Sequence, residues 1–418
     1  MLFAEAVDNN KSLNLTICRS KETRLCRVHV YRDAIEVHNG IRSNRVKLNG
    51  VNISFMSCRN LCSSGEDSIS VSFDASFDLV CQNNNDFYKM ENNICVAETI
   101  ICGFCEQKLG NIKDIKCDTN LQKPILLGED GLSIEGGFFC HQNKDNAPTL
   151  TETSVDAQTL LFEHDLNSSL NCRSTGLEMV LDCSFVEQNS FSVKKNNYVH
   201  CSYCQMAFGK KVSCGLREYV VFWTNRVNVL IREKSDTDDN FFRLVKQPLI
   251  FDDSKFYGLL ITNLVESNHY RIILSAITWD GLIDFMLIWL PDQRINLYTT
   301  SLEECKSSTT DNRKKPLKED GNNVSSSIHC INVEPNACRR VFYRLVFPDN
   351  CSSDKSRLLD SWRKDFGVTL IHLPIETCIG FSECLRKSSL QIAPHTRELN
   401  GPMAGFISGA VPLINASK

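Results

Sequence analysis

Long hydrophobic runs are missing from this 418-residue sequence, and their absence excludes an ordinary membrane-spanning helix. The most apolar stretch, residues 282–290, contains Asp284 and is followed by Pro291. It is much shorter than the roughly 20 residues that cross a bilayer, so we expect a buried strand there. Residues 1–8 have neither a basic start nor a long apolar run, which argues against a secretory signal. We therefore expect no membrane partner, and a cytoplasmic protein with the nucleus as an alternative location.

An excess of positive charge is also missing. The chain has 46 lysines and arginines against 50 aspartates and glutamates, and no basic stripe that would bind nucleic acid directly. Its one basic run, residues 313–318, lies in a polar stretch at residues 306–327. We interpret that stretch as a solvated insertion, with a localisation signal as the alternative. The sequence also has no histidine-rich ligand cluster, which disfavours a zinc hydrolase.

What the sequence does contain is 21 cysteines, an odd number spread irregularly along the chain. Without a secretory signal, a disulfide framework is not expected and most thiols should be reduced. Two segments, residues 102–110 and 201–209, are near-copies of one another. Each has two cysteines three positions apart, followed by a glycine at nearly the same distance.

The two cysteine pairs predict one structural zinc site. Such a zinc ion takes four ligands in a tetrahedron, and two Cys-x-x-Cys turns supply four thiolates. The glycine that ends each turn lets the chain fold back over the metal. The predicted ligands are Cys102, Cys105, Cys201 and Cys204. The alternative is two unrelated pairs of buried cysteines, because a separation of roughly 95 residues is longer than in an ordinary zinc finger.

Cys140 and His141 are a further candidate for metal binding, since two metal-competent side chains stand next to each other. Adjacent residues of an extended chain point to opposite faces, so only one of the two is expected to contact a given ion. Either Cys140 or His141 is therefore a candidate zinc ligand or a neighbour of the zinc ligands. The alternative is a buried cysteine beside a hydrogen-bonded histidine.

Hydrophobic periodicity predicts an α+β protein in three parts. Apolar residues alternate with polar ones around Val51, Ile53, Ile69 and Val71, as in the strands of a small sandwich. The pattern weakens after Cys102, where metal is expected to replace much of the core. We expect a β-rich, sandwich-like domain at 1–100, a zinc-binding region with long loops at 101–210, and an α+β C-terminal domain at 211–418 that carries the polar insertion.

The C-terminal part alternates between helical and strand patterns. Capping residues near Asp252 open a predicted helix, and Asp280-Gly281 predicts a tight hairpin turn before the strand at 282–290. A further strand at residues 294–300 is expected to close a meander. Two more helices are predicted, one through Trp362 and one through Cys378. The tail at 394–413 is too apolar to be free and too rich in glycine for a helix, so it should pack against the C-terminal domain or into a partner.

The order of these motifs resembles that of a known family. The chain runs from Cys-x-x-Cys through Cys-His to a second Cys-x-x-Cys, then through Trp289-Leu290 and the helix at 358–362 to the tail segments 373–378 and 394–401. This order resembles the HECT-like family of ubiquitin ligases that bind ubiquitin-conjugating enzymes, over residues 102–409. The resemblance implies a ubiquitin-protein transferase that accepts ubiquitin from a conjugating enzyme and passes it to protein substrates. It also implies, as one such partner, the endonuclease of pre-mRNA cleavage and polyadenylation.

Within this resemblance, Cys378 is the candidate acceptor of ubiquitin. Residues 373–378 are similar to the segment around the thioester cysteine of HECT ligases. The first turn of a helix favours the thiolate that such chemistry needs, and His372 is a candidate base.

The sequence also departs from the HECT pattern. Ile379 and Gly380 stand where Phe-Asn is usual, and the chain is too short for a two-lobed catalytic domain. Cys378, Phe381 and Leu385 follow a spacing that would bury the thiol. The alternative function is therefore a non-enzymatic, zinc-stabilised adaptor or chaperone for a conjugating enzyme or an mRNA 3′-end processing factor.

Overall fold

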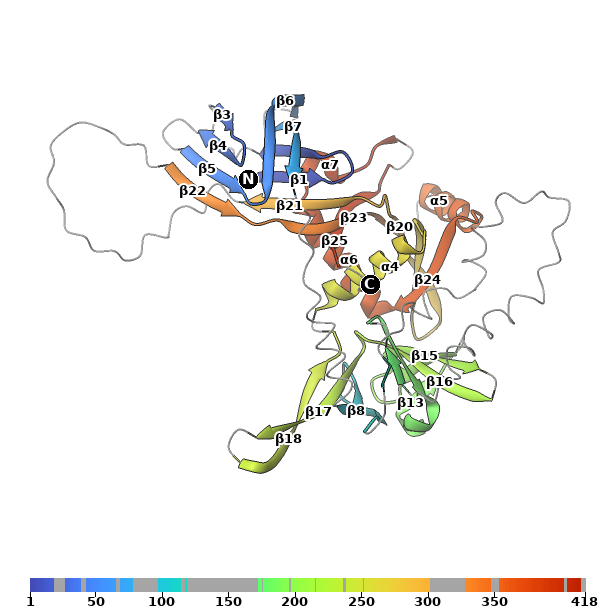
Figure 1. Ribbon diagram of the computed structural model, residues 1–418. Coiled ribbons are helices and arrows are strands. Elements are labelled where there is room, and N and C mark those ends of the chain that lie inside the picture. Colours follow the sequence, from blue (N-terminus) through green and yellow to red (C-terminus); the bar gives the residue numbers. More distant parts are fainter. Residues whose placement is uncertain are drawn as a thin grey trace. The chain divides into compact units, whose positions relative to one another are not determined.

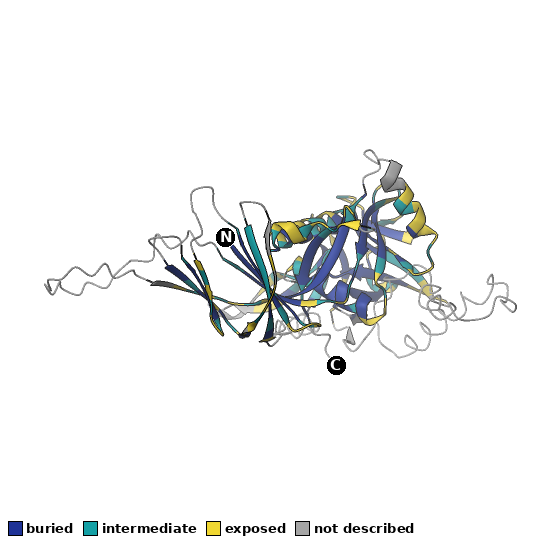
Figure 2. Cartoon of the chain, turned by 90° about the horizontal axis from the view of Figure 1, so that it is seen from above, coloured by how far each residue is buried: buried dark blue, intermediate teal, exposed yellow. Residues whose placement is uncertain are grey.

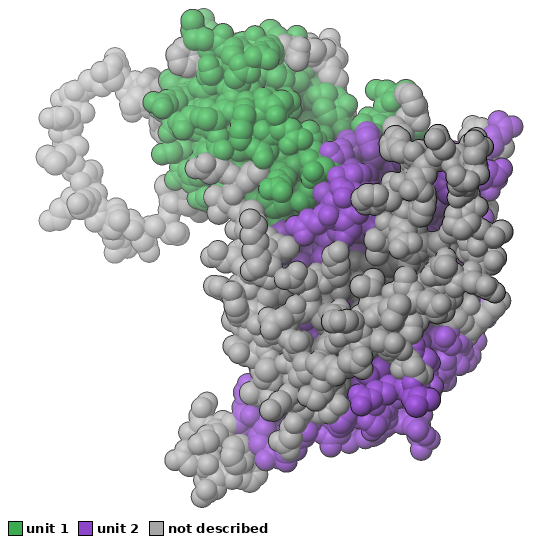
Figure 3. All heavy atoms as spheres, turned by 45° about the vertical axis from the view of Figure 1, so that its right-hand side comes forward, with its two compact units in different colours: residues 1–81, 292–340, 386–413 green, residues 82–291, 341–385, 414–418 purple. Residues whose placement is uncertain are grey.

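Strands dominate the computed structural model, which divides into two compact units (Figure 1). Unit 1 comprises residues 1–81, 292–340 and 386–413, and unit 2 comprises residues 82–291, 341–385 and 414–418 (Figure 3). The structure describes residues 1–18, 27–38, 43–64, 68–77, 97–113, 117–118, 172–174, 176–194, 197–214, 216–235, 238–250, 252–300, 328–346, 353–401 and 404–414. The polar insertion at 306–327 lies outside these residues.

Unit 1 is built from two sheets that bury one apolar core between them. The first sheet has the order β6 (Val51–Ser64), β7 (Ser68–Phe77), β2 (Ser12–Cys18), β1 (Leu2–Val7), β21 (Arg294–Thr300) and the first half of β23 (Asn336–Leu345). The second has the order β3 (Arg27–Val30), β4 (Ala34–His38), β5 (Ser43–Leu48) and β22 (Ile328–Val333). Alternating residues of both sheets form the core, among them Leu13, Val46 and Tyr298. The strands expected around Val51, Ile53, Ile69 and Val71 are confirmed.

Unit 1 is made of three separate segments of the chain, whereas the sequence suggests a first domain that consists of residues 1–100 alone. We expected β21 to extend a meander from the preceding strand, and this is wrong: β21 pairs with β1 and with β23. The chain is redirected directly before β21, where Pro291 is followed by Asp292 in the left-handed region (φ 45°). The tail belongs to the same unit and includes α7 (Pro394–Arg397), the buried Phe406 and β25 (Ile407–Pro412), which pairs with β23; it therefore shares a unit with the N-terminal strands and not only with the C-terminal part.

Unit 2 contains the mixed α and β elements expected near the C-terminus. Its strands β24 (Val368–Pro374), β19 (Arg271–Ile277), β20 (Leu282–Trp289) and the second half of β23 are neighbours in one sheet, with β24 parallel to β19. The helices are α4 (Asp253–Glu266), α5 (Ser353–Arg363) and α6 (Ile375–Ser389), which continues into unit 1. The Asp252 carboxylate accepts a hydrogen bond from the Ser254 amide at 2.8 Å, as the predicted cap requires. None of the described helices is long and apolar enough to span a bilayer.

Two further sheets of unit 2 carry the cysteine pairs. Their strands combine buried residues with half-buried and exposed ones (Figure 2). Both sheets contribute to one apolar core, which includes Ile100, Leu109, Val199 and Phe222. The described residues of this region therefore have an apolar core of their own, and our expectation that metal replaces much of that core is wrong for them. The sheet that carries the first pair has the strand order β18 (Asp238–Pro248), β17 (Val227–Ser235), β8 (Ala97–Cys102), β9 (Lys108–Asn111). The sheet that carries the second pair has the order β10 (Cys117–Asp118), β11 (Cys172–Ser174), β12 (Glu178–Asp182), β16 (Arg217–Trp223), β15 (Ala207–Cys214), β14 (Tyr198–Cys201), β13 (Phe191–Val193).

Candidate metal centre and the Cys378 helix

Each Cys-x-x-Cys segment forms the same short turn, here called a knuckle: residues 102–107 are the first knuckle and 201–206 the second. A strand ends at the first cysteine, and the chain returns through a residue in the left-handed region, Glu106 (φ 63°) or Gln205 (φ 64°). The Glu106 amide donates to the Cys102 carbonyl at 3.1 Å, and the Gln205 amide donates to the Cys201 carbonyl at 2.9 Å. The similarity seen in the sequence is therefore also a similarity of backbone conformation.

The glycine after each knuckle was expected to let the chain fold back over a metal, but in the structure it lies against a neighbouring backbone segment. A Cβ atom on Gly110 would lie 2.6 Å from the carbonyl oxygen of Phe185, and one on Gly209 would overlap the carbonyl of Val221. Both glycines allow a neighbouring backbone segment to pass closely, rather than letting the chain bend over a metal. Their equal spacing from the cysteines thus fixes how each knuckle sits on the strands beneath it.

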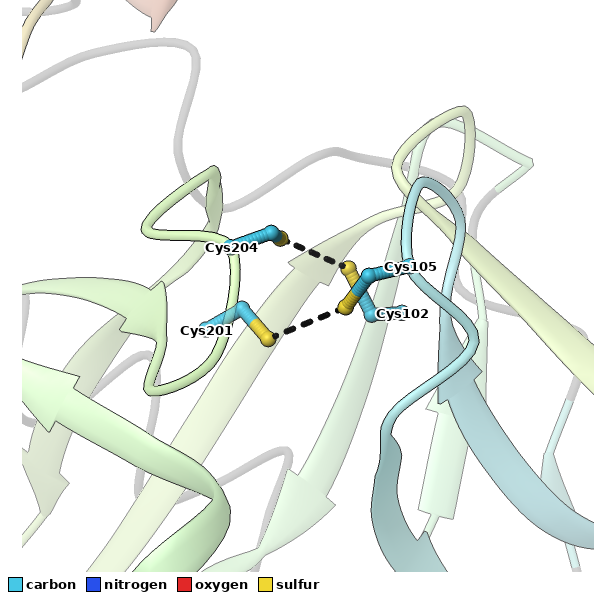
Figure 4. A group of neighbouring side chains, drawn as sticks. All are labelled: Cys102, Cys105, Cys201 and Cys204. Carbon is cyan, nitrogen blue, oxygen red and sulfur yellow. Dashed lines mark hydrogen bonds between the residues drawn. The ribbon is translucent and has the colours of Figure 1, made fainter.

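The four predicted cysteines lie together, with their sulfurs within 4.8 Å of one another (Figure 4). The Sγ atoms of Cys102 and Cys204 are 3.6 Å apart, and those of Cys105 and Cys201 are 3.5 Å apart. These distances are too long for a disulfide of about 2.05 Å. They are close to the roughly 3.8 Å edge of a tetrahedron with metal–sulfur bonds of about 2.3 Å. The four thiols therefore fit a tetrahedral, thiolate-bound metal ion.

The environment of the cluster is suited to a structural rather than a catalytic metal. Cys102 and Cys201 are buried, while Cys105 and Cys204 are half-buried. Burial raises the pKa of the Cys102 and Cys204 thiols, so a bound metal has to displace their protons. Four protein sulfurs would also complete a tetrahedral coordination sphere. Cys140 and His141 lie outside the described residues.

Helix α6 follows β24 directly, and Cys378 lies in its first turn, as the sequence predicts. Its side chain, however, is fully buried, and so are those of Phe381 and Leu385 on the same helical face. Burial raises the pKa of the Cys378 thiol, because the thiolate would lose its hydration. The sulfur donates a weak hydrogen bond to the Leu373 carbonyl at 3.6 Å. This environment agrees with the packing interpretation of the spacing and is unfavourable to a nucleophile.

Tyr257 on α4 explains one departure from the HECT pattern. Its ring stacks on that of Phe381 with 4.8 Å between centroids, and its hydroxyl donates to the Thr377 carbonyl at 3.2 Å. A Cβ atom on Gly380 would overlap this hydroxyl, so any other residue there would force Tyr257 to shift. The candidate base His372 instead has its Nδ1 atom 2.7 Å from the hydroxyl of Tyr198.

Arg226 connects the first knuckle to the Cys378 helix, a link that the sequence pattern did not indicate. The Gly103 amide donates to the Arg226 carbonyl at 2.9 Å. The Arg226 side chain donates through Nε to the Thr377 hydroxyl at 2.7 Å, one position before Cys378. A single arginine in a turn carries no periodic signal, so this contact becomes visible only in three dimensions.

Comparison with known proteins supports the resemblance. A family model described as "HECT-like Ubiquitin-conjugating enzyme (E2)-binding" matches residues 135–401, well over half of the chain. A curated protein from Pongo abelii, named as an E3 ubiquitin-protein ligase, is 23% identical over 313 residues, which cover 73% of this chain and 72% of that protein. No solved structure gives a significant match.

Proposed function

Since the chain belongs to the HECT-like family that binds ubiquitin-conjugating enzymes (E2), we propose that it acts as a ubiquitin-protein ligase. In this role it holds a ubiquitin-charged E2 and promotes transfer of ubiquitin to a protein substrate. The observation that carries the proposal is the family match over residues 135–401, which contains the second knuckle and the Cys378 helix. The name of the curated relative supports the same assignment.

The metal of the four-cysteine cluster is proposed to be zinc. Soft thiolate ligands in a closed tetrahedral set favour zinc over the hard cations magnesium and calcium. The ion would bind Cys102 and Cys105 on one knuckle and Cys201 and Cys204 on the other. It would join β8 to β14 and so stabilise unit 2, without taking part in transfer chemistry.

Transfer is proposed to proceed directly from the E2 to the substrate. A thioester at Cys378 requires a thiolate that a charged E2 can reach, but the Cys378 side chain is fully buried and its burial raises the pKa of the thiol. Direct transfer requires only that the ligase hold the E2 and the substrate together. It therefore agrees with the burial of this thiol, while a thioester at Cys378 would need α6 to move.

Ubiquitin and a protein substrate are the further partners that this activity requires. A role toward the endonuclease of pre-mRNA cleavage rests on the resemblance alone, as does the adaptor function that would need no catalysis. The cytoplasmic or nuclear location likewise remains a prediction.

The test is a discharge assay with purified E2 enzymes charged with ubiquitin, analysed on non-reducing gels. We expect the full chain to accelerate loss of the E2 thioester and to acquire no reductant-sensitive ubiquitin adduct itself. E2 binding without accelerated discharge would favour the adaptor. Neither binding nor discharge with any E2 tried would overturn the proposed function.

A further inference from the structure

The hairpin between β19 and β20 presents an unusual group of apolar side chains to solvent. Ile277 pairs with Leu282, and Thr278 and Gly281 close the turn, so that Trp279 and Asp280 are its two central residues. Trp279 is 53% exposed, Leu282 37% and Ile283 39%. Single exposed apolar residues are common, but three within five positions of one turn mark a surface that favours a partner.

This turn also lines one side of a cavity of about 370 Å³ within unit 2. Lys194, Tyr198 and His200 line the other side. The volume lies within the range of about 300–1,000 Å³ that is usual for ligand pockets, and it is large enough to take a side chain of another protein. The turn and the cavity together form one continuous feature, here called the Trp279 surface.

Several contacts hold Trp279 in place. The Lys194 ammonium lies 3.5 Å from the centroid of the indole ring, and the His200 ring meets it edge-on with 6.2 Å between centroids. His200 is itself buried, and its Nδ1 atom lies 3.0 Å from the Gln205 carbonyl of the second knuckle. A carbonyl only accepts, so Nδ1 carries the proton and the imidazole orientation is fixed. The indole is therefore pre-organised, although half of its surface is open.

We propose that the E2 docks on the Trp279 surface and inserts an apolar side chain between Trp279 and Leu282. This inference rests on the proposed function. The family description assigns E2 binding to residues 135–401, and every residue that lines the cavity lies in this range. Phe104, an exposed aromatic residue of the first knuckle, lies outside it. A pre-organised, half-open tryptophan beside a cavity is the kind of residue that dominates the binding energy of protein interfaces.

The experiment measures the affinity of the full chain for a panel of purified, uncharged E2 enzymes by biolayer interferometry. Trp279→Ala should weaken the binding of the preferred E2 at least about tenfold. The matched control is Phe366→Ala, because Phe366 is 93% exposed and also lies within the matched range. This control should bind within about twofold of the unchanged chain. Melting temperature and metal content verify that each variant is folded. If Trp279→Ala does not fold, Leu282→Ser serves as a second test of the same surface.

The outcomes separate the surface from the function. If the unchanged chain binds an E2 and both Trp279→Ala and Leu282→Ser bind it equally well, the surface assignment is overturned while the proposed function stands. An equal loss for Phe366→Ala also overturns it, because the effect is then not local. If the variants alter self-association on size exclusion and leave E2 affinity unchanged, a second copy is the occupant and the proposal is wrong. If the unchanged chain binds no E2, the proposed function fails and this inference with it.

Discussion

Replacing Cys378 by alanine should reduce stability and leave E2 binding and discharge intact. The side chain is fully buried, so the substitution removes one heavy atom from a packed environment and leaves a small cavity. By analogy with other single-atom deletions in cores, the loss is about 1 kcal/mol in the free energy of unfolding. The long 3.6 Å contact to the Leu373 carbonyl adds little to this value. For a unit of this size the melting temperature should fall by about 2–4 °C.

The loss is measured by urea unfolding followed by tryptophan fluorescence, and discharge of a charged E2 is assayed on the same samples. Cys384→Ala is the matched control, because Cys384 lies on the same helix but is only half-buried. Its unfolding free energy should fall by less. The reasoning is refuted if Cys378→Ala keeps full stability but loses a reductant-sensitive ubiquitin adduct that the unchanged chain forms. The thiol would then be accessible, and the thioester mechanism would be the better account.

Three further outcomes are expected. Cys102→Ser should release the bound metal, measured by elemental analysis, and unfold unit 2 at lower temperature; full metal occupancy in the folded variant would contradict the site. Gly380→Ala should destabilise the fold by about 1–3 kcal/mol through overlap with the Tyr257 hydroxyl, and adding Tyr257→Phe should recover part of that loss in a double-mutant cycle. The Gly367 amide, and then the Arg271 guanidinium, hold the pKa of Asp365 below its usual value. Asp365 therefore stabilises the fold above about pH 4 and loses this effect as pH falls through its lowered pKa, so Asp365→Asn should lower the melting temperature at pH 7 and do so progressively less as the pH falls below about 4.

Local features of this chain could be predicted from sequence because their causes are local. The two knuckles repeat the same residue types at the same spacing, and the four thiols do lie together. Asp252 caps α4, and β20 (Leu282–Trp289) lies within the apolar stretch 282–290 that predicts a strand. The cap and the strand depend on contacts within a few residues of each other, whereas the two knuckles lie 96 and 102 residues apart in their paired thiols and were matched through their repeated spacing.

The features that could not be predicted depend on contacts between distant segments. Nothing near β21 shows that it will pair with β1 rather than β20, because both alternatives bury the same alternating face. Tyr257, whose hydroxyl donates to the Thr377 carbonyl next to Cys378, lies 120 residues before Thr377. The helical spacing indicated a buried face, but the motif resemblance favoured an exposed thiol, and only the packing of α4 against α6 decides between them.

The pairing of β1 with β21 also constrains how the protein can be made. Leu2 lies opposite Thr300, so one edge of β1 stays without its partner strand β21 until almost 300 further residues have been synthesised. At roughly 5–20 residues per second the wait is on the order of 15–60 s. An unpaired strand edge attracts other chains during that time. Both knuckles are complete about 90 residues earlier, so metal capture by unit 2 can precede closure of unit 1. Nascent chains stalled near residue 250 should therefore hold metal while their N-terminal strands stay open to protease.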